Sequence, residues 1–237
     1  MTRLFLGSHE INVAQEKERD EFSVVLLGET SRYSIDKNGV VSPISGDLKN
    51  AFDNIKSVQP YALYLGFADC VGITSVSFPE LTSVSSYGLD SAFQNCTGIT
   101  SVSFPELTSV DERALQYTFY RCTGITSVSF LKLTTIGFYG LHDAFRECTG
   151  ITSVSFPELT SVDSYGLCYA FWNCTGITSV SFPKLTTVGS NGLDSAFYYC
   201  EGITELHFRA DAQSVIEAQS GYSSRFGATN ATIYFDL

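Results

Sequence analysis

The sequence has few basic residues and few side chains suited to catalysis. Of its 237 residues, 14 are Lys or Arg and 25 are Asp or Glu, giving a formal net charge of −11. Nucleic acids are bound by Lys and Arg that neutralise phosphates, and anionic membranes attract basic segments, so neither is expected as a partner. The three histidines, His9, His142 and His207, lie in different predicted elements without a nucleophile at a recognisable spacing. We therefore expect no enzymatic activity and no cofactor.

Targeting and ligand signatures are also absent. No run approaches the ~18 apolar residues of a membrane span. His9, Glu10 and Asn12 interrupt the short apolar start of the chain, so no signal peptide is expected. There is no phosphate-binding or calcium-binding loop motif, and no pair of cysteines has zinc-finger spacing, so no metal is expected. The sequence leaves the localisation open.

What the sequence has in abundance is repetition. The stretch Cys-Thr-Gly-Ile-Thr-Ser-Val-Ser-Phe-Pro at residues 96–105 returns nearly unchanged at 148–157 and 174–183, and a variant occupies 122–131. The spacing is 26 residues, and a fixed period of this length predicts a solenoid of stacked coils. The apolar positions of the period continue backward to residue 45, which predicts about seven coils. We expect an N-terminal β cap or attachment unit at 1–44, repeats at 45–202, and a C-terminal cap at 203–237.

Within a coil the hydrophobic period changes. Val76 and Phe78 alternate with serine as in a half-buried strand. A second short extended piece ends at Val84. Leu89, Ala92, Phe93 and Cys96 then fall at 0, +3, +4 and +7, which predicts one face of a short helix, with Gly98 as its terminator. In the terminal segments we expect a hairpin turn at residues 36–39, a polar helix at 211–220 and a last strand at 231–237.

Two phenylalanines recur at fixed phases of the repeat, and both series are predicted to be core. The first comprises Phe78, Phe104, Phe130, Phe156, Phe182 and Phe208, and the second Phe67, Phe93, Phe119, Phe145, Phe171 and Phe197. One cysteine per coil shares a third phase, at Cys70, Cys96, Cys122, Cys148, Cys174 and Cys200. We interpret this column as buried free thiols, with a disulfide ladder and metal binding as the alternatives. Cys168 and His142 occupy a different slot, which is predicted to be exposed.

The order Ile-x-x-Val-x-Phe-Pro, Leu-x-x-Val, Ala-Phe-x-x-Cys resembles the Treponema/BspA type of bacterial leucine-rich repeat. The framework positions are Ile73, Val76, Phe78, Leu81, Val84, Ala92, Phe93 and Cys96. The resemblance covers about residues 45–208. It implies a right-handed α/β solenoid with a parallel sheet on the concave face and short helices on the convex one. It also implies surface adhesins or phage structural proteins, with no catalytic residues to carry over.

The outward strand positions are serine in every full coil. This serine face comprises Ser75, Ser77, Ser101, Ser103, Ser127, Ser129, Ser153, Ser155, Ser179 and Ser181. It is either a solvated small-residue surface or a generic polar surface for a glycan or polymer; a regular hydroxyl lattice of the ice-binding kind is a third interpretation. Because it does not vary between coils, a selective partner is expected to bind elsewhere.

Variation gathers around the predicted helix. We name one group of variable residues the aromatic–arginine patch: Tyr117, Tyr120, Arg146, Tyr169, Trp172, Tyr198 and Tyr199. Tyr, Trp and Arg are the residues that anchor interfaces, and aromatic rings suit sugar stacking. The alternative is that these side chains pack sideways across coils and stiffen the stack.

The sequence therefore predicts a non-catalytic, adhesin-like binding module for protein or glycan. The alternative is a structural or virion-associated display protein attached, and perhaps self-associated, through residues 1–44.

Overall fold

The structure, a computed structural model, describes Phe52 and residues 55–237 in full and, within the first 48 residues, the backbone of seven strands. β1 (Leu4–Leu6) and β2 (His9–Ile11) form an antiparallel pair; β3 (Val13–Gln15), β4 (Glu21–Leu26), β5 (Glu29–Ile35) and β6 (Val41–Pro43) form an antiparallel sheet. The predicted turn at 36–39 and the predicted boundary between residues 44 and 45 lie outside the described residues.

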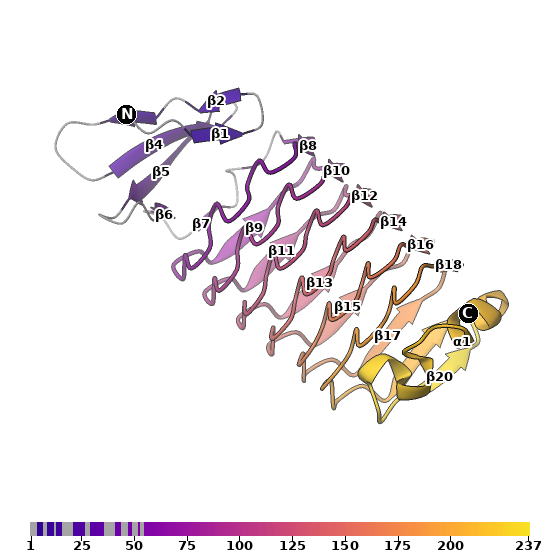
Figure 1. The fold of residues 1–237 in the computed structure, drawn as a ribbon. Helices are drawn as coiled ribbons and strands as arrows, with labels where there is room; N and C mark the ends of the chain where they lie inside the picture. Colours follow the sequence, from indigo (N-terminus) through magenta and orange to yellow (C-terminus); the bar gives the residue numbers. More distant parts are fainter. Residues whose placement is uncertain are drawn as a thin grey trace.

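The repeats form the predicted parallel β-solenoid, with coils stacked in a row (Figure 1). Two strands per coil build two ladders whose paired residues differ by one 26-residue period, as in Ser75 with Ser101 and Ser83 with Ser109. The first ladder contains β7 (Asp47–Leu48), β9 (Ser75–Ser77), β11 (Ser101–Ser103), β13 (Ser127–Ser129), β15 (Ser153–Ser155), β17 (Ser179–Phe182) and β19 (Glu205–Phe208), in three separately paired groups. The second is a continuous sheet of β8 (Ser57–Val58), β10 (Ser83–Val84), β12 (Ser109–Val110), β14 (Thr135–Ile136), β16 (Ser161–Val162) and β18 (Thr187–Val188).

Both phenylalanine series are buried, as predicted. Successive rings stack face to face along the axis, for example Phe78 on Phe104 at 5.4 Å and Phe93 on Phe119 at 5.5 Å between centroids. Each buried ring contributes roughly 1.5–3 kcal/mol through the water it excludes, and stacked pairs add to this. No coil can bury these rings by itself, so the core exists only in the stack.

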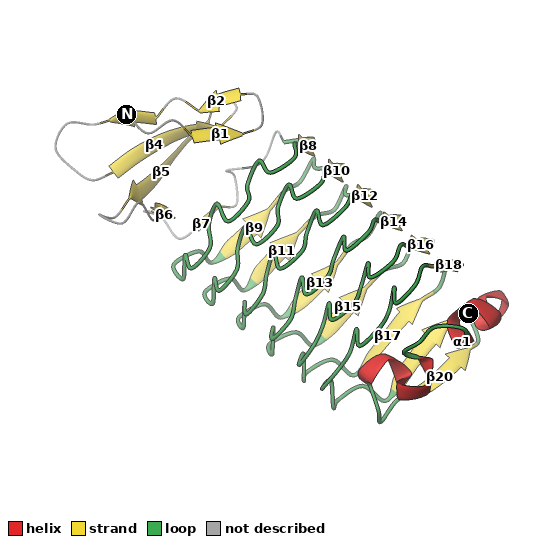
Figure 2. Ribbon diagram, viewed as in Figure 1, coloured by secondary structure: helices red, strands yellow, loops and turns green. Residues whose placement is uncertain are grey.

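The predicted short helix is wrong. Residues 85–96 are three consecutive turns, closed by hydrogen bonds from the amides of Gly88, Ala92 and Cys96 to carbonyls three residues earlier. We call this segment and its equivalents (59–70, 111–122, 137–148, 163–174 and 189–200) the turn ribbons; Figure 2 draws them as loops. A four-residue turn repeat also places residues 0, +3, +4 and +7 on one side, so the apolar pattern fits both structures.

Hydrogen bonds between coils decide the outcome. The amides of Leu89, Ser91 and Phe93 donate to carbonyls 25 residues later, in the next coil, with N···O distances of 2.8–2.9 Å. In a helix those amides would bond within their own segment. The third residue of every turn has a positive φ, between 50° and 63°, although none is glycine. This conformation is uncommon for non-glycine residues and costs roughly 1–3 kcal/mol each, which the ladder between coils must offset.

Gly98 is not a helix terminator either. Its φ lies outside the left-handed region, and a Cβ at this position would meet the Val71 carbonyl oxygen at 2.2 Å. Gly124, Gly150 and Gly176 face the preceding coil in the same way. The glycine is required because neighbouring backbones approach too closely for a side chain.

The chain ends after the last coil with short helices and a strand. η1 (Ala210–Ala212), α1 (Gln213–Glu217) and η2 (Tyr222–Gly227) precede β20 (Thr232–Phe235), which pairs in parallel with β19. The α-helix is shorter than the one expected at 211–220. Phe226 is buried against the Phe208 ring at 6.1 Å, so this segment covers the end of the core.

Candidate functional site

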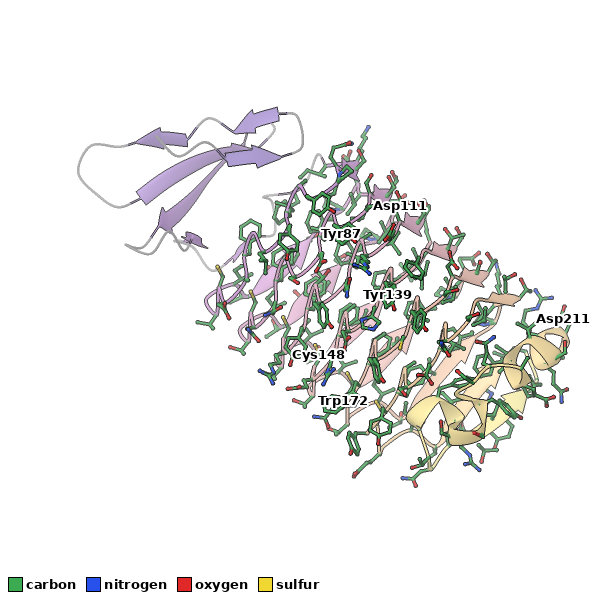
Figure 3. The ribbon with its side chains drawn as sticks, viewed as in Figure 1. Tyr87, Asp111, Tyr139, Cys148, Trp172 and Asp211 are labelled. Carbon is green, nitrogen blue, oxygen red and sulfur yellow. The ribbon has the colours of Figure 1, made fainter. Side chains whose placement is uncertain are left out.

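The turn ribbons place the variable side chains in rows on one face of the stack. Each residue with positive φ repeats 26 positions later, so three rows run along the axis. Figure 3 labels Tyr87, Tyr139 and Trp172 on this face. Because the ladder between coils fixes the backbone, side chains in one row contact each other across coils.

The first row is an aromatic ladder containing one arginine. Tyr61 stacks on Tyr87, and Tyr139 stacks on Tyr165, both with centroids 4.8 Å apart. Between the two pairs lies Arg113, whose guanidinium carbon is 5.5 Å from the Tyr87 ring centroid and 5.1 Å from that of Tyr139. Its Nη1 also donates to the Tyr87 hydroxyl at 2.9 Å. These contacts are the sideways packing that the alternative interpretation expected.

The aromatic–arginine patch is continuous in the structure. The Arg146 guanidinium lies 6.0 Å from the Tyr120 ring centroid and 4.3 Å from that of Trp172. Trp172 meets the Tyr199 ring edge-on at 5.4 Å. At the other end the rings of Tyr120 and Tyr117 are 6.0 Å apart.

The two remaining patch residues join through neighbours. Tyr198 lies against Tyr199 at 4.3 Å between centroids. Tyr169 reaches Tyr117 through the His142 ring, which lies 5.9 Å from both. All seven predicted residues therefore belong to one connected surface, of which Tyr198 and Tyr199 are the most exposed, at 40% and 51%.

A buried carboxylate underlies this surface. Asp143 is 1% exposed, and its Oδ1 accepts a hydrogen bond from Arg146 Nη1 at 3.2 Å. His142 Nδ1 lies 2.7 Å from Oδ2, off the direction needed for a hydrogen bond. Burial and, secondarily, the charge of Asp143 raise the pKa of Tyr117 to about 12, so its hydroxyl stays neutral at physiological pH. The sequence did not reveal Asp143, because its slot holds Ser, Tyr and Asp in turn.

Glu147 anchors the rim of the same surface. It accepts a hydrogen bond from Arg121 Nε at 2.8 Å and another from the Tyr120 hydroxyl at 3.3 Å. Arg121 in turn lies over the Tyr120 ring at 4.9 Å. The patch side chains are therefore held in place before any partner arrives.

Two sequence predictions about exposure are wrong. Cys168 is 2% exposed, and burial raises its pKa to about 12. The side chain of His142 is only 13% exposed. Their slot follows a residue with positive φ, which turns the next side chain back toward the stack. A helix would have directed it toward solvent.

The six in-phase cysteines are free and buried, as interpreted from the sequence. Each thiol from Cys96 onward lies 2.9–3.2 Å from a carbonyl oxygen 29 residues earlier, as in Cys96 to Phe67. Burial raises the pKa of the thiols, to about 11 for Cys70 and about 12 for Cys96 and Cys200. A reactive thiolate is therefore disfavoured throughout the column.

The serine face lies on the outward side of the first ladder. From Ser101 onward all eight of its serines are exposed, while Ser75 and Ser77 are partly buried. At its end His207 lies 2.9 Å from Asp236, and that hydrogen bond, with a smaller contribution from Glu205, raises the histidine pKa. In the part of the chain that the structure describes, no three His, Cys, Asp or Glu side chains gather as a metal site would require.

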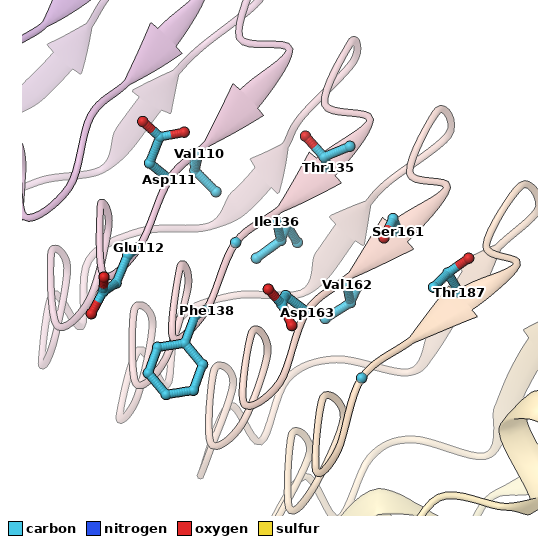
Figure 4. Close-up of a pocket in the computed structure, with 12 residues that line it drawn as sticks. Val110, Asp111, Glu112, Thr135, Ile136, Phe138, Ser161, Val162, Asp163 and Thr187 are labelled. Carbon is cyan, nitrogen blue, oxygen red and sulfur yellow. The ribbon is translucent and has the colours of Figure 1, made fainter.

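A groove lies beside the second ladder, and sequence reasoning missed it. It has a volume of about 540 Å³ and crosses the coils that contain β12, β14, β16 and β18. Its lining includes Asp111, Glu112, Phe138 and Asp163, together with strand hydroxyls (Figure 4). The signal was present in one slot of the repeat, which reads Asp111, Gly137, Asp163 and Gly189 in successive coils.

The geometry defines the class first: a parallel β-solenoid whose 26-residue coils carry constant core positions and variable turn positions. The BspA type leucine rich repeat region matches in six copies, over residues 49–165 and 116–224. The chain therefore belongs to the BspA-type leucine-rich repeat family.

Two further comparisons complete the picture. A leucine rich cell surface protein from Faecalibacterium prausnitzii A2-165 is a similar solved structure, with 16% identity and a TM-score of 0.31. The match covers 77% of this chain and 64% of that one, so this chain spans less than two thirds of that protein's length. The search of curated proteins gave no significant match. None of the helices in the described part of the chain has the length and apolar character of a membrane span.

Proposed function

We propose that this chain is a non-catalytic binding module that acts at a surface and recognises a macromolecular partner through the aromatic–arginine patch. The observation that carries the proposal is the contact chain from Tyr117 through Arg146 and Trp172 to Tyr198. Tyr, Trp and Arg dominate binding energy at interfaces. A protein partner is favoured over a glycan, because the patch is broad and combines stacked rings with ion pairs.

Preorganisation supports this assignment. Fixing a flexible side chain on binding costs roughly 0.5–1.5 kcal/mol. Arg146 is already held by Asp143 and Trp172, and Tyr120 by Glu147, so much of that cost is met when the protein folds. The same contacts stiffen the stack. Packing across coils and recognition are therefore compatible roles for the same side chains.

A non-catalytic role agrees with the chemistry of the described residues. The Asp143 carboxylate is enclosed by Arg146, His142 and Tyr117 rather than directed at a cavity. The thiols are buried with raised pKa values, so they lack the activation that a nucleophile needs.

The test is an array of extracellular proteins and glycans probed with the whole chain and with Trp172→Ala. Leu131→Ala is the matched control, because Leu131 is a 53% exposed apolar residue outside the patch. Loss of a central anchor of at least 2 kcal/mol corresponds to about 30-fold weaker binding. We expect Trp172→Ala to show that loss on a protein target and Leu131→Ala to bind normally. Equal binding by both variants would reject the patch.

The second candidate is a display protein attached through residues 1–44. Strands β1 to β6 pair only with one another, in antiparallel arrangements unlike the parallel ladders that follow. Light scattering on the full chain and on a chain lacking residues 1–44 tests it. This role predicts a full-length oligomer that becomes a monomer after the deletion; a monomer in both cases excludes self-assembly through this segment.

A further inference from the structure

The groove beside the second ladder combines the three kinds of group that recognise a sugar. It holds an aromatic ring, carboxylates and hydroxyls on one open surface of about 540 Å³. None of its lining residues belongs to the aromatic–arginine patch. From these observations we propose that the groove is a binding site for a linear, uncharged oligosaccharide lying along the solenoid axis.

The shape of the groove follows from an alternation in the sequence. Successive coils place Asp111, Gly137, Asp163 and Gly189 at one position, directly after β12, β14, β16 and β18. The glycines let their coils approach the preceding backbone, since a Cβ on Gly137 would lie 2.9 Å from the Asp111 carbonyl carbon. They also leave no side chain between the two carboxylates. Parallel rungs are about 4.8 Å apart, so two coils separate the carboxylates by about 10 Å, a spacing that an extended chain can bridge.

The aromatic contribution comes from Phe138, which is 38% exposed at the rim of the groove. Its ring meets Tyr139 edge-on at 4.5 Å and Tyr165 at 6.3 Å, so the Tyr139–Tyr165 stack supports it from behind. A rigid exposed ring offers its apolar face to the C–H groups of a sugar. Phe138 follows Gly137 without an intervening residue, so the ring stands beside the open floor.

The polar contribution comes from both sides. Thr135, Ser161 and Thr187 lie in successive strands of the second ladder, and Figure 4 shows their hydroxyls in a row across from Asp111 and Asp163. Hydroxyls donate and accept, whereas ionised carboxylates only accept, from up to four directions. This set matches the many hydroxyl donors of a saccharide.

Charge selects the class of sugar. Asp111, Glu112 and Asp163 line the groove, and no Lys or Arg is among its lining residues. A sialylated or sulfated glycan would bring its own negative charge against these carboxylates. The whole chain adds a net charge of −11. The ligand is therefore a neutral saccharide, and binding should depend little on salt.

An array of neutral linear oligosaccharides, their sialylated and sulfated counterparts, and a polylysine peptide tests this inference. We expect the full chain to bind neutral members selectively. Phe138→Ala and the double variant Asp111→Asn/Asp163→Asn should each weaken that binding at least tenfold. Leu131→Ala and Trp172→Ala should leave it unchanged, and this separates the groove from the patch of the proposed function.

The outcomes that overturn the inference are distinct. Binding to no neutral saccharide, or binding that survives Phe138→Ala, shows that the groove is not a sugar site. Preference for polylysine, lost at high salt and in the double Asn variant, would make the groove a site for basic peptides. Thermal melting of each variant identifies any loss that comes from unfolding, and the separate Asp163→Asn variant replaces the double variant if that one is unstable.

Discussion

The guanidinium carbon of Arg146 lies 4.3 Å from the centroid of the Trp172 ring, across one coil boundary. This pair joins the two halves of the aromatic–arginine patch, and Arg146 also binds the buried carboxylate of Asp143. Recognition and coil stacking thus depend on the same side chain.

Arg146→Ala should change both the stability and the tryptophan signal. A partly desolvated cation–π contact contributes about 0.5–2 kcal/mol, and a buried carboxylate that loses its cation adds to the cost. Trp172 is the only tryptophan in the chain, so its fluorescence reports on this contact directly. A double-mutant cycle with Trp172→Ala should give a coupling of about 0.5–2 kcal/mol. A coupling near zero would mean that the two groups are merely adjacent.

Gly150→Ala should destabilise the fold by about 2 kcal/mol or more, since its Cβ would meet carbonyl oxygens of the preceding coil at 2.5 and 2.8 Å. Gly72→Ala is the matched control, because a Cβ on Gly72 meets nothing within 4 Å. Urea denaturation of the two variants measures the difference. If both lose the same free energy of unfolding, close approach of the coils is not why glycine occupies this slot.

Ser195→Gly should leave the free energy of unfolding unchanged or raise it slightly. Ser195 has a φ of 51°, where glycine has no steric cost. Ser195→Val should lower it by about 1–2 kcal/mol, because a β-branched residue is disfavoured there. Ser181→Gly, on strand β17, is the control and should cost about 0.5–1 kcal/mol. A loss of stability in Ser195→Gly as large as in the control would argue for a helical segment instead.

All seven cysteines should resist a thiol reagent at pH 8 in the native protein, because all are buried. Unfolding in guanidinium should expose seven reactive thiols. Cys168 provides the sharpest comparison, since exposure predicted from the sequence would give one fast-reacting thiol. Mass spectrometry after brief alkylation counts them. One labelled thiol at Cys168 would contradict the turn-ribbon geometry.

Stability should fall at alkaline pH. Burial raises the pKa of Cys96 from 9.0 to about 12, so the folded chain holds a proton that the unfolded chain releases first. The contribution is fully present below pH 9 and is lost as the pH rises from 9 toward 12. Denaturation midpoints across this range measure the effect. Cys96→Ala should show a shallower fall than the wild type, and an identical pH profile would assign the fall to other groups.

Much of the architecture could be predicted from the sequence. The 26-residue period, the inward Val76 and Phe78, and the uniform serines fixed the coil length, the strand phase and the core. These features depend on local alternation and on the identity of successive repeats, and both are properties of the chain alone. The seven candidate patch residues were also found by their variation from coil to coil.

The tertiary structure decided how the segment 85–96 folds and what it presents. Its apolar spacing suits a helix and a ribbon of turns equally, and only hydrogen bonds to the next coil favour the turns. That choice buries Cys168 and His142, places Asp143 beneath Arg146, and leaves a groove between Asp111 and Asp163. Each of these involves residues about one or two periods apart or a side-chain direction set by positive φ. The sequence by itself determined that coils would stack; the contacts between coils determined which side chains face solvent.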